Sequence, residues 1–161
     1  MNNEEKTKSI TAHGLISEAL GLQASYFVLE NESKQVLASH IERKTLILAG
    51  LKQSSSLILS FATEIALKAL LKFRFNLFPK IHDLEGLFNK LSSEDKLQLS
   101  IIFNSKTNLN IHEFLEKNKN SFMEFRYFEG QINQPFDNMN LNEALDAIII
   151  YYNQLLQESK N

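Results

Sequence analysis

The chain of 161 residues contains no cysteine, only five glycines and only two prolines. The absence of cysteine excludes disulfide bonds, thiolate chemistry and cysteine-built metal sites. So few glycines and prolines leave little material for the tight turns that a sheet protein requires. Leucine, isoleucine, lysine, glutamate and phenylalanine are abundant instead, and we therefore expect an all-α protein.

The chain also lacks a strong charge of either sign and a long apolar run. Its formal net charge is −2, so no global positive field attracts nucleic acid, and an RNA contact would need a local basic patch. The first residues lack the charged-then-apolar order of a signal peptide. No apolar run approaches the roughly 18 to 20 residues that span a bilayer. We expect a cytoplasmic protein with no membrane contact.

The stretch from Ser54 to Leu91 organises the rest of the chain. Apolar residues between Leu57 and Phe75 cover more than one face of a helix, which predicts a central helix surrounded by others. A narrow polar stripe recurs at every fourth residue of this helix, at Ser56, Ser60, Glu64, Lys68 and Lys72.

The central helix is expected to end at Asn76 and Pro79. His82 and Asp83 then open a short amphipathic helix. The 1–9 segment is polar, and a helix from Ile10 is expected to stop at Gly21.

A further amphipathic helix is expected over residues 33–51, where His40 and Arg43 would share one surface. Residues 52–56 either interrupt this helix or join it to the central one.

After the central region, Ser92 or Ser93 is expected to cap a helix that runs to about Asn104. Its inward residues would be Leu97, Ile101 and Phe103. Residues 104–110 are expected to form a loop, residues 111–129 one or two helices, and residues 130–139 the longest loop.

The final helix has the clearest period. Asn140 and Glu143 have the spacing of a capping box, and one continuous apolar face follows them. Ile150 and Tyr151 fall outside this face. Either they are scattered exposed or additional core residues, or they contact a second subunit in a homodimer.

Together these patterns predict one domain over residues 1–161, an all-α bundle of about five or six helices. A buried helix with Glu64, Lys68, Ala69 and Leu70, followed by His82-Asp83-Leu84 and Leu87, resembles the HEPN domains (higher eukaryotes and prokaryotes nucleotide-binding). Arg126-Tyr127 before the last helix is a second similarity. The resemblance covers about residues 30–158 and leaves 1–29 as an N-terminal extension, which could be an extra helix.

The resemblance implies a test for ribonuclease activity. Catalytic HEPN enzymes use an arginine and a histidine with four to six residues between them, and they act without metal. Histidine suits proton transfer and guanidinium suits a phosphate. The nearest pair here is Arg74 and His82, with seven residues between them, Phe75 in the expected polar position and Pro79 interrupting. The standard motif is absent.

The polar residues of this region leave alternatives open. His82 and Asp83 either cap the short helix, or His82 carries a proton beside a phosphate. Glu64 and Lys68 either form an internal ion pair, completed by Arg126 or His82, or they line a pocket for a nucleotide or an RNA phosphate.

Arg126 and Tyr127 also have two interpretations. Either they join the helices, or Arg126 binds a phosphate and Tyr127 stacks on a base. Four basic residues and three phenylalanines also alternate near the end of the central helix, where they could form a phosphate-binding and stacking surface: Lys68, Lys72, Arg74, Lys80, Phe73, Phe75 and Phe78.

We expect a HEPN-like accessory protein that is associated with a nucleotide or RNA or binds a partner, and that is not catalytic. The resemblance implies a bacterial toxin–antitoxin or phage-defence setting, homodimerisation, and a partner encoded nearby, such as a nucleotidyltransferase. No cofactor and no metal are expected. The alternatives are a metal-independent endoribonuclease that pairs Arg74 or Arg126 with His82, and a purely structural helical adaptor.

Overall fold

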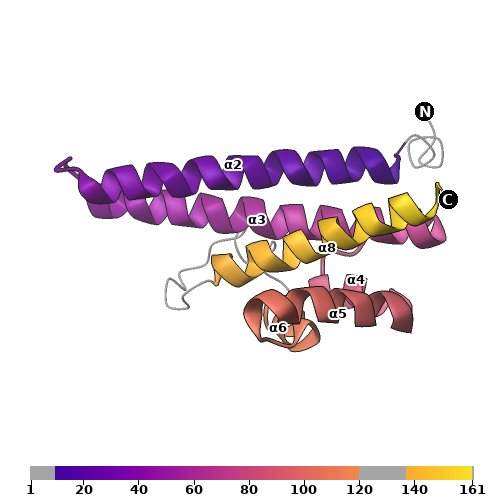
Figure 1. Cartoon of the computed structure of the whole chain (residues 1–161). Helices are drawn as coiled ribbons and strands as arrows, with labels where there is room; N and C mark the ends of the chain where they lie inside the picture. The colour runs from indigo at the N-terminus through magenta and orange to yellow at the C-terminus, as the bar shows by residue number, and fades with distance from the viewer. Residues whose placement is uncertain (1–9, 120–136, 161) are drawn as a thin grey trace.

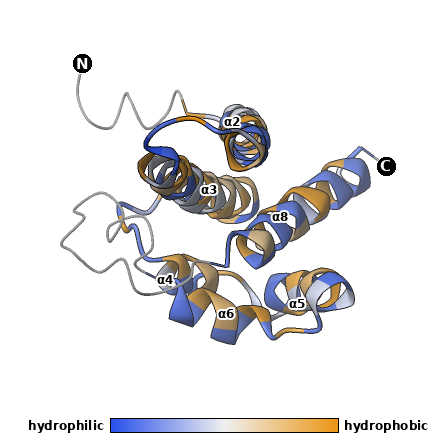
Figure 2. Ribbon diagram, turned by 90° about the vertical axis from the view of Figure 1, so that its left-hand side faces the viewer, coloured by the Kyte–Doolittle hydropathy of each residue, from blue (hydrophilic) through white to orange (hydrophobic). Residues whose placement is uncertain are grey.

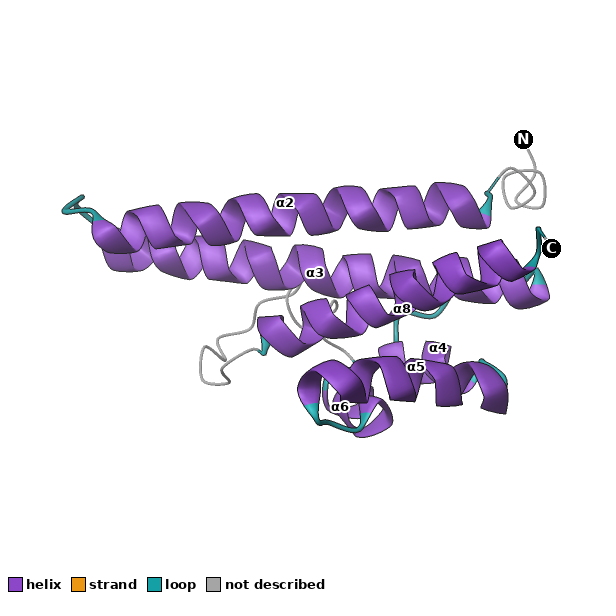
Figure 3. Ribbon diagram, viewed as in Figure 1, coloured by secondary structure: helices purple, strands orange, loops and turns teal. Residues whose placement is uncertain are grey.

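The computed structural model describes residues 10–119 and 137–160. This part of the chain forms six helices and contains no strand (Figure 3). The prediction of an all-α bundle is confirmed. Residues 1–9, 120–136 and 161 lie outside the described part, and so do the predicted site residues Arg126 and Tyr127.

The first two helices, α2 (Ala12–Ala38) and α3 (Lys44–Phe75), form a long antiparallel hairpin (Figure 1). Thr11 caps α2 by accepting a hydrogen bond from the amide of Gly14. The expected stop at Gly21 is wrong, because α2 continues through it. A glycine inside a helix costs only about 1 kcal/mol relative to alanine, and buried residues on both sides, such as Ala19 and Tyr26, hold the helix in place.

The turn between α2 and α3 occupies residues 39–43 and contains neither glycine nor proline. Arg43 adopts the left-handed conformation, with φ 58°, immediately before α3. The Lys44 ammonium group donates hydrogen bonds to the main-chain carbonyls of Leu37 and Ser39. A cation at this position also stabilises the negative end of the α2 dipole.

This turn corrects the expected helix over residues 33–51, which belongs partly to α2 and partly to α3. His40 lies in the turn and Arg43 precedes α3, so the two do not share a helix surface. No break occurs at residues 52–56, and α3 is continuous over 32 residues. Residue 30, at which the resemblance to HEPN domains begins, lies inside α2.

The core lies around the second half of α3, whose residues are almost all buried from Leu59 to Leu71. The last helix, α8 (Asn138–Glu158), packs against this half of α3. Three shorter helices complete the bundle: α4 (Leu84–Asn89), α5 (Ser93–Thr107) and α6 (Ile111–Lys117). Helix α4 packs against α3, α5 packs against α8, and α6 packs against α4 and α5. Viewed along the hairpin, α8 lies beside α3, with α4 below α3 and α5 below α8 (Figure 2).

Of the two serines expected to cap α5, Ser92 is the cap. It forms a capping box, in which Ser92 accepts from the Asp95 amide and the Asp95 side chain accepts from the Ser92 amide. The helix extends to Thr107, beyond the expected end. The expected inward positions Leu97 and Ile101 are wrong, since both are more than half exposed. Phe103 is fully buried as expected, and packing against α8 and α6 buries Leu99 with it.

Helix α8 buries the expected apolar face, but its cap lies three residues earlier than expected. Its cap is Asp137, which accepts a hydrogen bond from the Asn140 amide, so the Asn140–Glu143 capping box is wrong. Tyr151 is buried within the chain, with 5% of its surface exposed, whereas Ile150 is 37% exposed. Of the two predicted subunit contacts, only Ile150 lies on the surface. None of the helices in the described ranges combines the length and apolar character needed to span a membrane.

Candidate functional site

The first candidate site is the α3–α4 corner, which we define as the end of α3 and residues 77–83 that connect it to α4. Helix α3 ends at Asn76, as the sequence predicted, and Asn76 adopts the left-handed conformation, with φ 54°. Residues 77–83 then lead back along the end of α3. The Leu84 amide at the start of α4 donates a hydrogen bond of 3.1 Å to the main-chain carbonyl of Lys119, which ties this corner to the chain after α6.

A charged cluster closes this corner. The Lys68 ammonium nitrogen and the His82 Nδ1 atom lie 2.8 Å and 2.9 Å from the same oxygen of Glu64, Oε1. Lys68 also lies over the ring of Phe78, with its nitrogen 5.5 Å from the ring centroid. The structure thus forms the internal ion pair that the spacing of Glu64 and Lys68 allows, and His82 completes it.

The cluster is sealed on the α3 side and open at the histidine. The side chains of Glu64 and Lys68 are 1% and 5% exposed, whereas His82 is 49% exposed. Within the described residues, Oε2 of Glu64 is buried without a hydrogen-bond partner. Because a buried carboxylate oxygen without a donor is costly, a ligand that approached past His82 and donated a hydrogen bond to it would be favoured.

Asp83 occupies the cap position of α4 but does not cap it with its side chain. Its main-chain carbonyl accepts from the Leu87 amide, and its Oδ1 atom is buried without a partner in the described part of the chain. The expectation that the Asp83 carboxylate accepts helix amides is wrong. The neighbouring Gly86 leaves room for this side chain, since a Cβ atom there would lie 2.8 Å from Asp83 Oδ2.

Arg74, the other half of the displaced ribonuclease pair, faces a different partner. Its Nε atom lies 2.8 Å from Oδ1 of Asp95, whose side chain is fully buried. Oδ1 also accepts a hydrogen bond of 2.8 Å from the Tyr151 hydroxyl, and Oδ2 accepts one of 2.7 Å from Ser92. Arg74 is therefore engaged at the junction of α3, α5 and α8, while His82 is engaged with Glu64.

Tyr151 is a structural member of this junction. Burial, followed by the hydrogen bond to the Asp95 carboxylate and its charge, raises the pKa of Tyr151 well above its ordinary value. A tyrosine that stays protonated keeps its hydroxyl as a donor to Asp95. Sequence reasoning missed this three-helix junction. The one feature of the sequence that could have indicated it is the acidic first turn of α5.

The basic and aromatic residues near the end of α3 do not form one binding surface. Lys68 is buried in its ion pair and Arg74 is paired with Asp95. The Phe73 ring packs edge-on against Tyr152, with centroids 5.3 Å apart. Lys72 is half-buried. Lys68, Arg74 and Phe73 of the expected stacking surface are thus engaged in ion pairs and ring packing, whereas Phe75 and Lys80 remain exposed.

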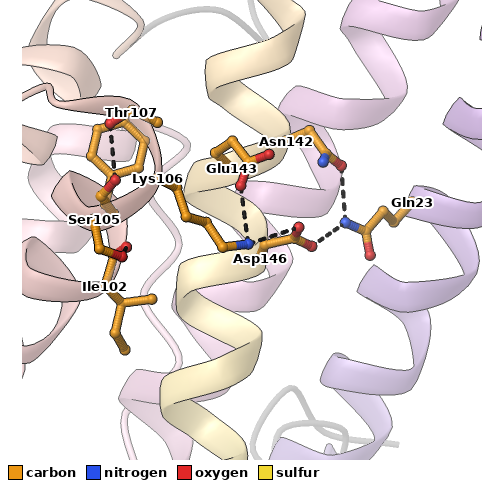
Figure 4. Close-up of polar contacts among 9 residues, drawn as sticks. Gln23, Ile102, Ser105, Lys106, Thr107, Asn142, Glu143 and Asp146 are labelled. Atoms are coloured by element: carbon orange, nitrogen blue, oxygen red, sulfur yellow. Dashed lines mark hydrogen bonds and ion pairs between the residues drawn. The ribbon is translucent and has the colours of Figure 1, made fainter.

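A second polar network joins α2, α5 and α8 (Figure 4). The Gln23 amide nitrogen donates to Asn142, at 2.9 Å, and to Asp146, at 2.6 Å. The Lys106 ammonium nitrogen lies 3.0 Å from a Glu143 oxygen and 3.4 Å from Asp146. Burial lowers the pKa of Lys106, but the hydrogen bond to Glu143 and the charges of both carboxylates more than offset this effect and raise it. The network fixes α8 between its neighbours.

The most distinctive surface is one that sequence reasoning missed. We define the hairpin surface as residues 27–54, the end of α2, the turn and the start of α3. No apolar side chain in this range is buried, and Ser33 is its one buried residue. Six large apolar side chains are between 39% and 70% exposed: Phe27, Val28, Leu37, Ile41, Leu46 and Ile47.

The position of α8 explains why the hairpin surface is uncovered. Asn138, the first residue of α8, accepts a hydrogen bond of 2.8 Å from Ser56, so α8 starts at the level of Ser56. The α2–α3 hairpin continues past this point with no described helix beside it (Figure 1).

Neither candidate site resembles a metal centre, since no group of three or more histidine and acidic side chains gathers within the described ranges. Comparison of the chain with protein-family models, with curated proteins and with solved structures finds no match.

Proposed function

We propose that this protein is a non-catalytic accessory module that binds a protein partner through the hairpin surface. The observation that supports this function is the run of 28 residues, 27–54, in which six large apolar side chains are exposed and none is buried. Exposed apolar patches of this kind mark protein–protein contacts more often than ordinary surface.

The charge of the hairpin surface also favours a protein over RNA. It carries three acidic residues, Glu30, Glu32 and Glu42, and four basic ones, Lys34, Arg43, Lys44 and Lys52. A net charge of only +1 supplies little of the phosphate neutralisation on which RNA binding depends. The partner best suited to this surface presents an apolar helix face, because a two-helix layer buries its apolar side by packing against further helices.

The engagement of Arg74 supports a non-catalytic role. A phosphate-binding arginine needs free donors, yet Arg74 is paired with the buried Asp95, and His82 is paired with Glu64. Purified protein should therefore not cleave RNA in the presence of a chelator. Cleavage that disappears in His82→Ala but persists in His40→Ala, a variant of an exposed turn histidine, would instead establish the endoribonuclease.

Partner binding is tested by placing a photo-crosslinking amino acid at Leu46 in one variant and at Leu97 in another. Both side chains are more than half exposed, but Leu97 lies on α5, away from the hairpin. We expect a defined crosslinked species from position 46 that is lost when Phe27→Asp is added. Equal crosslinking at both positions, or none at position 46, contradicts the proposal.

A second candidate function is nucleotide binding at the α3–α4 corner, as the resemblance to HEPN domains implies. Glu64 Oε2 has no hydrogen-bond partner in the described part of the chain and lies beside the half-exposed His82, which favours this function, since ribose hydroxyls and base amino groups are suitable donors. Titration calorimetry with adenosine and uridine monophosphates tests it. Binding that is lost in Glu64→Gln and retained in His40→Ala supports this function, and absence of heat with every nucleotide argues against it.

A further inference from the structure

Helices α2 and α3 hold each other unequally along their length. Near the core, α2 buries Leu15, Ala19 and Tyr26, and α3 buries almost every residue from Leu59 to Leu71. Over the hairpin surface, residues 27–54, no apolar side chain of either helix is buried. Because apolar burial is the main stabilising contribution to helix packing, the projecting half of the hairpin is less stable than the half beside the core.

The seam between α2 and α3 is weak where the hairpin projects. At the three- and four-residue spacing of packed helices, it contains four half-buried apolar residues and two buried serines: Leu29, Ser33 and Val36 on α2, and Leu48, Leu51 and Ser55 on α3. The Ser33 hydroxyl donates to the Leu29 carbonyl of its own helix, and the Ser55 hydroxyl has no partner in the described part of the chain. No ion pair of the described residues joins the two helices. Little in this seam therefore opposes separation of the helices.

The turn at the tip of the hairpin contains a strained residue and a contact that closes it. Arg43 has φ 58°, and the other two non-glycine residues with positive φ in the described ranges are Asn76 and Asn108. Asparagine tolerates this conformation better than arginine. The Lys44 ammonium group donates to two main-chain carbonyls at the end of α2. Carbonyls at a helix end have no partner within the helix, so Lys44 joins the start of α3 to the end of α2.

We propose that the hairpin surface is a conformational device, in which residues 27–54 open and close as one unit while the core half of both helices stays folded. Each arm is about three turns long, and isolated helices of that length are marginal in water, so the arms lose their helical structure when they separate. Only the closed state presents the hairpin surface, and opening therefore limits how much of the protein can bind a partner. The opening is a property of the chain alone, whereas its regulatory role rests on the proposed function.

Hydrogen exchange of the full folded chain, at several urea concentrations below the unfolding transition, tests the opening. Amides of residues 29–36 and 48–53 should exchange at least about tenfold faster than those of residues 59–71, and the two segments should share one free energy of opening. This free energy should fall with urea, but less steeply than that of global unfolding, because only part of the buried surface is exposed. Exchange that does not respond to urea would show residue-by-residue fraying and overturn the inference.

A variant outside the hairpin distinguishes opening of the unit from global unfolding. Ser92→Ala, which removes the cap of α5, destabilises a part of the protein that stays folded in the open state. It should therefore accelerate exchange at residues 59–71 by about fivefold or more and leave residues 29–36 and 48–53 unchanged. Equal acceleration in all three segments would show that the hairpin exchanges only through global unfolding, and the inference would fail.

The contact of Lys44 should control the opening. Lys44→Met should accelerate exchange at residues 29–36 and 48–53 by about threefold or more, since only the closed state contains its hydrogen bonds. Arg43→Asn should slow this exchange, because asparagine adopts a positive φ more readily. The matched control Lys52→Met removes an exposed lysine of the same surface and should change neither segment. Equal rates in Lys44→Met and Lys52→Met would overturn the device as proposed.

Crosslinking from position 46 tests the proposed function independently of the opening. A hairpin that exchanges only with the core but crosslinks from position 46 leaves the proposed function in place without the device. A hairpin that opens as expected but gives no crosslink leaves the device in place without the proposed partner.

Discussion

The Nε atom of Arg74 lies 2.8 Å from Oδ1 of Asp95, a carboxylate with no exposed surface. This contact joins the last turn of α3 to the first turn of α5, and the Tyr151 hydroxyl adds α8 to it. A buried carboxylate is tolerated only when donors surround it. The three-helix junction therefore depends on the completeness of its hydrogen bonds, and the stability of the fold should respond to each of them.

Replacing Arg74 tests the cationic donor. Arg74→Met should lower the free energy of unfolding by about 1–3 kcal/mol, because Asp95 keeps the bonds from Tyr151 and Ser92 but loses its ion pair. Arg74→Lys should lower it less, since the charge remains. Urea denaturation followed by circular dichroism measures both. Equal stability of Arg74→Met and the wild type would show that water replaces the guanidinium without loss.

Tyr151 should make stability depend on alkaline pH. Its pKa in the folded protein lies above its value of about 10 in an unfolded chain, so the folded state retains the phenolic proton more strongly. This contribution to stability is complete below pH 10 and decreases as the pH rises above 10, where the unfolded chain releases the proton first.

The comparison of Tyr151→Phe with Tyr152→Phe measures that contribution. Tyr151→Phe should lower the free energy of unfolding at pH 8 by about 1–3 kcal/mol, because a buried carboxylate loses a donor. The loss of stability between pH 9 and 11 should be smallest in this variant and intermediate in Tyr152→Phe, because burial alone raises the pKa of Tyr152. Three identical pH profiles would contradict the role of the Tyr151 proton.

The ion pair of Glu64 and Lys68 should behave as a coupled unit. Lys68→Met leaves the buried carboxylate with His82 alone, and we expect a loss of about 3–5 kcal/mol. The double variant Glu64→Leu with Lys68→Met removes both charges and should be more stable than Lys68→Met. A double-mutant cycle by urea denaturation measures the coupling, and additive effects would show that the two charges act independently.

Two adjacent serines, Ser92 and Ser93, test which residue caps α5. Ser92→Ala removes the acceptor for the Asp95 amide and one donor to its carboxylate. The expected loss is about 1–2 kcal/mol. Ser93→Ala, one residue inside the helix, should change stability by less than about 0.5 kcal/mol. Thermal unfolding of the two variants distinguishes them, and a larger effect at Ser93 would place the cap there.

The sequence predicted those parts of the fold that depend on local pattern. The density of apolar residues in α3, the cap at Ser92 and the end of α3 at Asn76 all follow from neighbours within one or two turns. The Glu64–Lys68 pair was also accessible, because a spacing of four fixes it on one helix face.

What the sequence could not predict depends on packing between distant segments. The turn at residues 39–43 has no glycine or proline, and Arg43 takes a positive φ that its residue type disfavours. The choice of Leu99 over Leu97 as a core position is made by α8 and α6. Likewise, the exposure of Leu46 follows from where α8 begins, which no local pattern around Leu46 reveals.

The order of the helices has a consequence for how the protein folds. Helices α2 and α3 are joined by a short turn, so their contacts are close in sequence and can form early. The second long helix that packs against the core half of α3, α8, follows more than sixty residues later. During synthesis the apolar side of α3 that packs against α8 therefore stays exposed until the final helix has been made. In this interval the nascent hairpin can aggregate or bind chaperones through that side.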